Sequence, residues 1–224
     1  MLQTDYRCPS QTDRTVQKVV LNPRPSGHGL GFGDINGDGR TDIILTDGWL
    51  EQPTSDPWRA PWPFHPEFSL GAASVPIIAY DVNGDGHTNL MVGQAHDYGL
   101  HWFEQRIQDD GGRRWIRHQI DTETSQLHDL QLADLDNDGV AELVTGKRYR
   151  AHNDGDPGAH DPVGLFYYKI DGGRFERHVI DYGQAGQASG AGIYFWIQDL
   201  TGNGFPDIVA PGKDGLYWFE NLGG

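Results

Sequence analysis

The residues best suited to chemistry lie in an acidic loop, within the sequence GFGDINGDGRTDIIL. Its oxygen-bearing residues alternate with glycines, which permit a backbone tight enough for the oxygens to converge. Hard oxygen ligands on a flexible loop suit Ca²⁺ better than a soft transition metal. The spacing matches the first half of an EF-hand loop, but the distal Glu is missing and strand-forming residues flank the loop. The expected ligands are Asp34, Asn36, Asp38, the carbonyl of Arg40, and Asp42.

Three further loops repeat this pattern, and their first aspartates follow one another at intervals of 47, 53 and 65 residues. We expect the loops to bind calcium and stabilise the fold without catalysing a reaction, because ligation satisfies their carboxylates. The fourth loop has only two carboxylates and should bind calcium weakly or not at all. The expected ligands are Asp81, Asn83, Asp85 and Asn89 in the second loop, Asp134, Asp136, Asp138, Val140 and Glu142 in the third, and Asp199, Thr201, Asn203 and Asp207 in the fourth.

A pair of histidines shares one register in the repeats. His28 and His128 each precede the first aspartate of their loop by six residues, whereas Val75 and Ile193 stand there in the other repeats. An inner strand therefore separates both histidines from the acidic loops. In a four-bladed ring, repeats one and three face each other across the axis. We expect His28, His128 and His96 to hold a second divalent metal: Zn, Mn or Mg.

Other polar side chains follow the second strand of each repeat and should reach the same end of the molecule. The segment 146–163 is long and rich in Gly, Asp and His, and long connections on a compact scaffold are typical of functional sites. The competing interpretation is that these are scattered loop residues, since histidine also occurs on outer strands. The candidate catalytic residues are His96, Tyr98, Lys147, Arg148 and His152, and the candidate substrate-binding residues are Trp58, Trp62 and Lys213.

The repeats predict an all-β fold, a propeller of four-stranded antiparallel blades with four blades in this chain. Residues 1–13 form an N-terminal arm, and residues 14–224 form a single domain. A strand at 14–20 should pair with the last blade and close the ring, leaving no free sheet edge. The repeats lie near residues 28–68, 75–120, 128–180 and 193–221.

Composition excludes several classes of protein. The chain of 224 residues has a net charge of −15 and no basic stripe, so nucleic-acid binding is not expected. No apolar run approaches the length of a membrane span. The start, MLQTDYRCPS, lacks the apolar core of a signal peptide. We nevertheless expect an extracytoplasmic or secreted protein. A homo-oligomer is one possible state of the protein. Cys8 is the only cysteine, so no internal disulfide forms.

The acidic loops and their flanking strands resemble the FG-GAP/VCBS-type repeats of calcium-binding β-propellers. A narrower resemblance lies in HGLGFGDINGDGR, AHDYGLHWFEQ and SQLHDLQLADLDNDGVAELVTGKRYRAHNDGDPGAHDP. These segments are similar to the propeller domain of aldos-2-ulose dehydratase-like proteins, which remove water from keto-sugars such as 1,5-anhydrofructose with metal assistance. This chain departs from them by being short.

That resemblance implies a metal-assisted carbon–oxygen lyase acting on a keto-sugar or related carbohydrate. Tyr98 or a free histidine would remove the proton next to the carbonyl, and Lys147 and Arg148 would stabilise the enolate. The alternative is a calcium-dependent module that binds a carbohydrate or a protein and carries out no reaction. The matched pair His28 and His128 favours the enzyme, because a pure binding module has no need of it.

Overall fold

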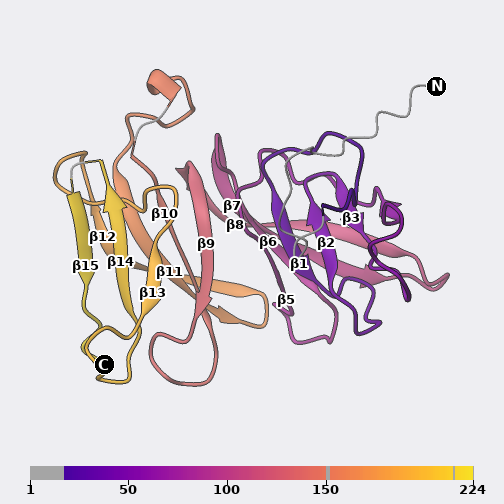
Figure 1. Cartoon of the computed structure of the whole chain (residues 1–224). Helices are drawn as coiled ribbons and strands as arrows, with labels where there is room; N and C mark the ends of the chain where they lie inside the picture. The colour runs from indigo at the N-terminus through magenta and orange to yellow at the C-terminus, as the bar shows by residue number, and fades with distance from the viewer. Residues whose placement is uncertain (1–17, 150–151, 214, 224) are drawn as a thin grey trace, which may run out of the picture.

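The computed structural model describes residues 18–149, 152–213 and 215–223, which form β-strands and one short 3-10 helix (Figure 1). Antiparallel hairpins follow one another and build four sheet units. In these ranges no helix is long and apolar enough to cross a membrane. Unit one contains β1 (Leu30–Gly33), β2 (Asp42–Leu45), β3 (Gly48–Leu50) and β4 (Phe64–His65), and unit two contains β5 (Ile77–Tyr80), β6 (Asn89–Gly93), β7 (Tyr98–Ile107) and β8 (Arg113–Ser125). Unit three contains β9 (Leu127–Ala133), β10 (Glu142–Lys147), β11 (Val163–Asp171) and β12 (Arg174–Gly183), and unit four contains β13 (Trp196–Gln198), β14 (Asp207–Gly212) and β15 (Gly215–Phe219).

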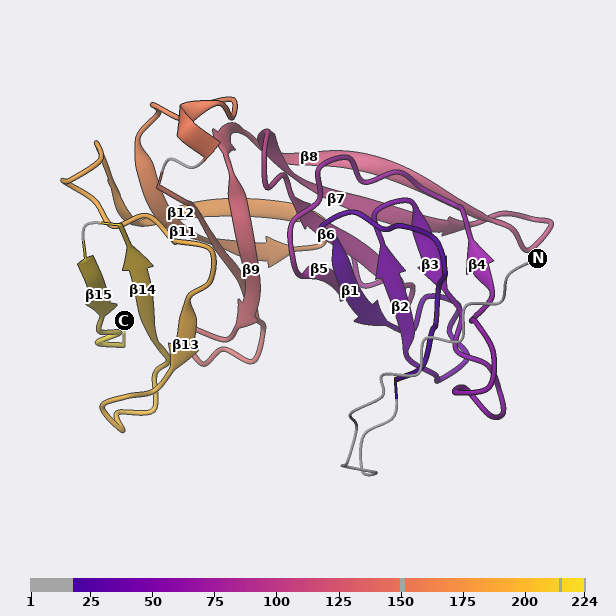
Figure 2. The ribbon, with the colours of Figure 1, turned by 45° about the horizontal axis from the view of Figure 1, so that its top comes forward.

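Within each unit the chain runs as an antiparallel meander from the first strand outward. Units one and two share one sheet, because β1 and β5 pair in parallel at Gly31–Ile77 and Phe32–Ile78. The units follow one another along a curved arc, with unit one and unit four at opposite ends (Figures 1 and 2). An all-β chain of curled, meandering sheets is consistent with a β-propeller.

The hydrophobic core lies between successive units, because alternate residues of each strand face the neighbouring sheet. Each interface between two units needs a large apolar residue on both of its sides. Trp49 of unit one and Phe103 of unit two belong to the first cluster. Trp102 of unit two and Phe166 of unit three belong to the second. Phe195 of unit four belongs to the third, together with side chains of unit three.

A buried side chain closes each acidic loop. It lies at the start of the second strand and accepts a hydrogen bond from the backbone N–H of the residue after the loop's first aspartate. Because the four loops share this contact, they share one conformation, with left-handed backbone at the same two positions in each. The contacts are Ile35 to Asp42 (2.9 Å), Val82 to Asn89 (3.0 Å), Leu135 to Glu142 (2.8 Å) and Leu200 to Asp207 (3.0 Å).

Each later unit is hydrogen-bonded to the same point of the preceding unit. The Gln105 side chain of unit two donates to the Ile35 carbonyl at 3.1 Å. The Gly173 amide of unit three donates to the Val82 carbonyl at 3.1 Å. The Asn221 side chain, at the end of unit four, donates to the Leu135 carbonyl at 2.8 Å. These bonds fix the register between units at the end that carries the acidic loops.

The expected closing strand at 14–20 falls mostly outside the described residues. Its described part, residues 18–20, is not a strand, and the carbonyl of the adjoining Leu21 accepts a hydrogen bond from the Trp62 amide in unit one. Among the described residues, β15 has no strand on its outer side. The described residues therefore form an open arc, and closure into a four-bladed ring stays a prediction.

The buried imidazole of His101 makes stability depend on pH. Only 3% of His101 is exposed, and burial, together with the nearby Arg117 guanidinium, lowers its pKa from 6.5 to about 4. The unfolded chain therefore takes up a proton below about pH 6.5 that the folded chain refuses. We predict that acidification from pH 7 to pH 5 lowers the free energy of unfolding, by about 1–2 kcal/mol from this group.

Urea unfolding of His101→Gln at the two pH values tests this prediction. The variant should lose less stability between pH 7 and pH 5 than the wild type, whatever its stability at pH 7. His118→Gln is the control, because this imidazole is more exposed and lies beside the carboxylate of Glu104. An equal pH dependence in wild type and His101→Gln would contradict the assignment.

Candidate functional site

Four histidines from three units meet at the end of the arc opposite the acidic loops. His28 precedes β1, His96 follows β6, and His128 lies in β9. His152 begins the 3-10 helix η1 (His152–Asp154), which Figure 1 shows above the sheets, while the acidic loops lie below them. We call His28, His96, His128 and His152 the histidine cluster.

His96 lies at the centre of the histidine cluster. Its ring centroid is 5.0 Å from that of His28, 5.2 Å from that of His128 and 4.7 Å from that of His152. The Nε2 atom of His96 is 3.3 Å from Nδ1 of His28, and the centroids of His28 and His128 are 6.4 Å apart. The rings of the three histidines expected to share a metal are therefore neighbours, but among the described residues these three do not form a set whose ligand atoms all lie within 4.8 Å of one another.

Asp156 adds a carboxylate to this group. His96, His152 and Asp156 each offer a ligand atom, and these atoms all lie within 4.8 Å of one another. Two imidazoles and a carboxylate form a ligand set suited to a divalent transition metal. Sequence reasoning placed Asp156 in the 146–163 segment without choosing it as a ligand. Its position four residues after His152 is a signal that could have identified it.

Arg148 holds the carboxylate of Asp156 in place. The guanidinium, whose side chain is only 6% exposed, donates to Asp156 at 2.7 Å and lies 3.3 Å from Nδ1 of His96. Burial raises the pKa of the Asp156 carboxyl, but hydrogen bonds from His152, His96 and Arg148 outweigh it and lower that pKa to about 2. Asp156 is therefore a carboxylate throughout the physiological pH range.

His128 is a neutral member of the histidine cluster. Burial and the nearby Arg148 guanidinium lower its pKa from 6.5 to about 4, so the imidazole carries no charge at pH 7. Its Nε2 atom is buried and has no hydrogen-bond partner among the described residues. A neutral imidazole with an available nitrogen can accept a proton or bind a metal.

Tyr98 differs from its expected role as a base. Its hydroxyl donates a short hydrogen bond to Asp161, a residue of the 146–163 segment that sequence reasoning did not select. That hydrogen bond, followed by burial, raises the pKa of the Tyr98 hydroxyl. Tyr98 therefore keeps its proton, which suits it to donate a hydrogen bond and not to remove a proton from carbon.

Lys147 also differs from its expected role. The side chain is 1% exposed, and its ammonium donates to Gln126 at 3.0 Å. Burial lowers the pKa of Lys147 from 10.5 to about 8. Because the ammonium is enclosed, its geometry favours a structural role over direct contact with a substrate.

A small hollow of about 210 Å³ adjoins the histidine cluster between units one and two. His28, His96, Thr46 and Gly71 are among the residues that line it. Small residues complete the wall, so the hollow admits a compact ligand next to two imidazoles. The larger hollow, of about 630 Å³, lies instead between units three and four, beside the third acidic loop.

The expected substrate-binding residues occupy different surroundings. Trp58 is 59% exposed, whereas the indole N–H of Trp62 donates to the Pro57 carbonyl at 2.7 Å. Both tryptophans lie in the connection between β3 and β4, in the outer part of unit one. Lys213 lies over the ring of Tyr149, 5.5 Å from its centroid.

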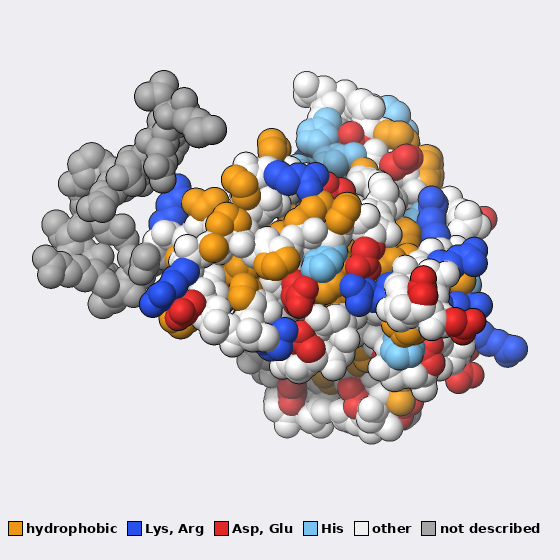
Figure 3. Space-filling view, turned by 90° about the vertical axis from the view of Figure 1, so that its right-hand side faces the viewer, with side chains coloured by type: hydrophobic (Ala, Val, Ile, Leu, Met, Phe, Trp, Pro, Cys, Tyr) orange, Lys and Arg blue, Asp and Glu red, His pale blue; other side chains and the backbone are white. Residues whose placement is uncertain are grey.

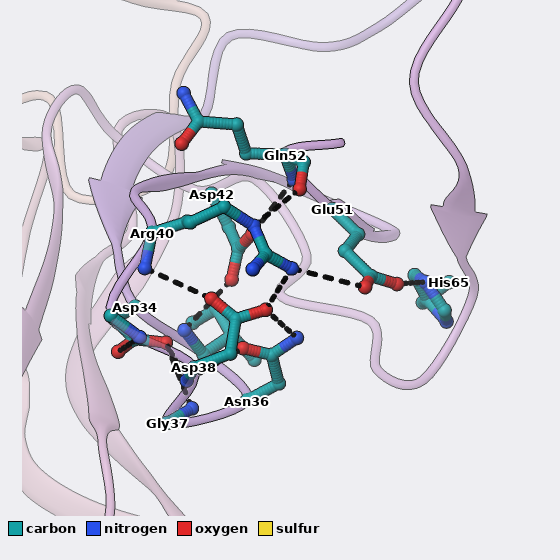
Figure 4. Close-up of polar contacts among 11 residues, drawn as sticks. Asp34, Asn36, Gly37, Asp38, Arg40, Asp42, Glu51, Gln52 and His65 are labelled. Atoms are coloured by element: carbon teal, nitrogen blue, oxygen red, sulfur yellow. Dashed lines mark hydrogen bonds and ion pairs between the residues drawn. The ribbon is translucent and has the colours of Figure 1, made fainter. Parts of the chain in front are cut away.

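The first acidic loop is folded around its own backbone amides (Figure 4). The Asp34 carboxylate accepts hydrogen bonds from the amides of Gly37 (2.8 Å), Asp38 (3.0 Å) and Gly39 (2.7 Å). The Asp38 carboxylate is in close contact with the Arg40 guanidinium. The loop conformation is therefore supported by protein contacts, while Asp34 stays partly exposed and Asp38 exposed.

The third loop gathers the most negative charge. Asp134, Asp136 and Asp138 each place a carboxylate oxygen within 4.8 Å of the others. The ammonium of Lys169 lies 2.5 Å from Asp136 and compensates part of this charge. Three convergent carboxylates form a group that a calcium ion could neutralise more completely than one lysine.

The last expected ligand of every loop has a contact that sequence reasoning did not anticipate. Asp42, Asn89, Glu142 and Asp207 are at most 2% exposed and bind the backbone amides described above. Burial is the largest influence on Asp42 and Glu142, and it raises the pKa of both carboxyls. These side chains therefore close the loop through hydrogen bonds to its backbone.

Comparison with known families gives one match. Residues 61–145 match the FG-GAP-like repeat. The matched region contains all of unit two and extends through the third acidic loop to β10. A search of curated proteins found no match. The repeat match and the curled sheets together support an FG-GAP-type propeller.

Proposed function

We propose that the protein is a metal-assisted carbon–oxygen lyase that removes water from a keto-sugar or related carbohydrate. The observation that carries the proposal is the convergence of His96, His152 and Asp156, with ligand atoms within 4.8 Å of one another. His28 and the hollow of about 210 Å³ adjoin these ligands, so a small substrate has room beside them. The reaction class comes from the resemblance to aldos-2-ulose dehydratase-like proteins.

Such an elimination breaks the carbon–hydrogen bond next to a carbonyl, forms a carbon–carbon double bond and releases the β-hydroxyl as water. A bound divalent metal would polarise the carbonyl and make that proton more acidic. An imidazole of the histidine cluster that does not bind the metal would accept the proton. Tyr98 would give up its hydrogen bond to Asp161 and donate its proton to the departing hydroxyl, which leaves as water.

Arg148 has a positioning role in this proposal. It is buried, and its two partners are the Asp156 carboxylate and His96. Holding both groups at a fixed separation limits the reorganisation needed when a metal binds. The proposal therefore has Arg148 hold the metal ligands in position. The sequence alone had suggested that Arg148 stabilises the enolate.

A second candidate is a calcium-dependent module that binds carbohydrate or protein without catalysis. The exposed indole of Trp58 favours it, because a flat apolar ring can stack on a sugar face. In this case the histidine cluster would bind no metal. Metal binding and water release therefore distinguish the two candidates.

Metal titration tests the proposed ligands. Calorimetric titration of the chelator-treated protein with Zn²⁺ or Mn²⁺ should show one strong site. His96→Ala and His152→Ala should each lower the metal affinity by at least about tenfold, because removing even a residue that only hydrogen-bonds to a metal ligand has an effect of that size. His87→Ala is the matched control, because His87 is an exposed histidine in the second acidic loop.

The same variants test the reaction. Wild-type protein supplied with metal and 1,5-anhydrofructose should produce an unsaturated ketone, which absorbs in the ultraviolet, and His96→Ala should not. Strong metal binding without product would support the metal site but contradict the proposed substrate class. Equal metal affinity in His96→Ala and wild type would contradict the site itself.

Calcium binding by the acidic loops is a separate proposal. Three convergent carboxylates in the third loop repel one another, so a bound Ca²⁺ should stabilise the fold. Chelation should therefore lower the melting temperature measured by circular dichroism. Asp134→Ala should cost more stability than Asp199→Ala, because the fourth loop has fewer carboxylates. A melting curve that chelation leaves unchanged would contradict the proposal.

A further inference from the structure

The outer face of unit four is equivalent to a face that is buried elsewhere in the chain. The third strands β7 and β15 carry the related sequences GLHWFEQ and GLYWFEN, so Leu216 corresponds to Leu100 and Trp218 to Trp102. Leu100 is 0% exposed and Trp102 5% exposed against unit three, whereas Leu216 is 73% and Trp218 54% exposed. Unit four therefore presents the face that unit two uses to bind the next unit.

The acidic loops also indicate, independently, that unit four presents a face that the earlier units cover. Ile35 and Val82 follow the first aspartates of loops one and two, and they are 2% and 3% exposed beneath the next unit. Leu200 is the corresponding residue of loop four and is 55% exposed. The carbonyls of Ile35, Val82 and Leu135 accept hydrogen bonds from the following unit. Leu200 marks the point at which another unit would attach.

The opposite end of the arc presents the complementary face. Counting from the first aspartates, Leu30 and Phe32 of β1 correspond to Ile77 and Ala79 of β5, which pack against unit one. Ile77 is 1% exposed, whereas Leu30 is 39% and Phe32 60% exposed. Figure 3 looks at this side of the molecule and shows hydrophobic side chains gathered near the middle of the face.

We propose that unit four of one copy packs against unit one of a second copy, head to tail. Each face is the register equivalent of one half of an interface that the chain already forms internally. Gln52 of the second copy corresponds to Gln105 and would donate to the Leu200 carbonyl, as Gln105 donates to Ile35. A contact between two different faces builds a closed ring when the rotation between copies closes, and an open filament otherwise. Exposed apolar faces of this kind favour association.

Light scattering coupled to gel filtration tests the proposal. The wild-type protein should have at least twice the 24.9 kDa mass of one chain. Leu216→Lys should return it to the mass of a monomer, because a lysine in the interface would be buried without a partner. Val179→Lys is the matched control: Val179 is 60% exposed on β12, away from both end faces, so its assembly should be unchanged.

Three results would overturn the proposal. A wild-type monomer, with or without the predicted closing strand at 14–20, would show that no second copy covers unit four. An oligomer that Leu216→Lys leaves intact would place the contact elsewhere. Equal dissociation by Val179→Lys would show a general effect of added charge. Circular dichroism of both variants should match the wild type, because both side chains are exposed in one copy.

Discussion

The hydrogen bond between the residue after each loop's first aspartate and a buried side chain seven positions later is the contact on which the arrangement of units depends. It fixes the acidic loop in one conformation, because it connects the end of the first strand to the start of the second. The carbonyl of the same residue accepts the hydrogen bond from the next unit. One residue thus joins the folding of a hairpin to the stacking of its neighbours, and losing the buried acceptor would leave an unsatisfied amide in the core.

This constraint also positions the histidine cluster. Because the units are held in equivalent register at the loop end, residues at equivalent distances from their loops meet at the other end. His28 and His128 are such a pair, and His96 reaches them from the segment that follows β6. The connection between β10 and β11 then supplies His152, Asp156 and Asp161. The scaffold gives the register, and one long connection supplies ligand and hydrogen-bonding groups.

The sequence predicted these features to different extents, for physical reasons. The glycine and aspartate spacing of the loops reports local conformation, so their four equivalent turns could be predicted. The shared register of His28 and His128 also predicted their proximity, because one inner strand has a fixed length. Spacing could not show that Asp42 faces inward or that Lys147 is enclosed, because burial depends on neighbours from other units. The donor role of Tyr98 depends in the same way on Asp161, which is 63 residues away.

The proposed metal centre requires histidines from different units to share one metal. Electron paramagnetic resonance of the protein loaded with one equivalent of Cu²⁺ tests this claim directly, because pulsed methods detect each imidazole nitrogen coupled to the metal. We expect couplings from at least two histidines, with one coupling lost when His96 or His152 is replaced. A single imidazole, or a spectrum that neither replacement changes, would contradict it.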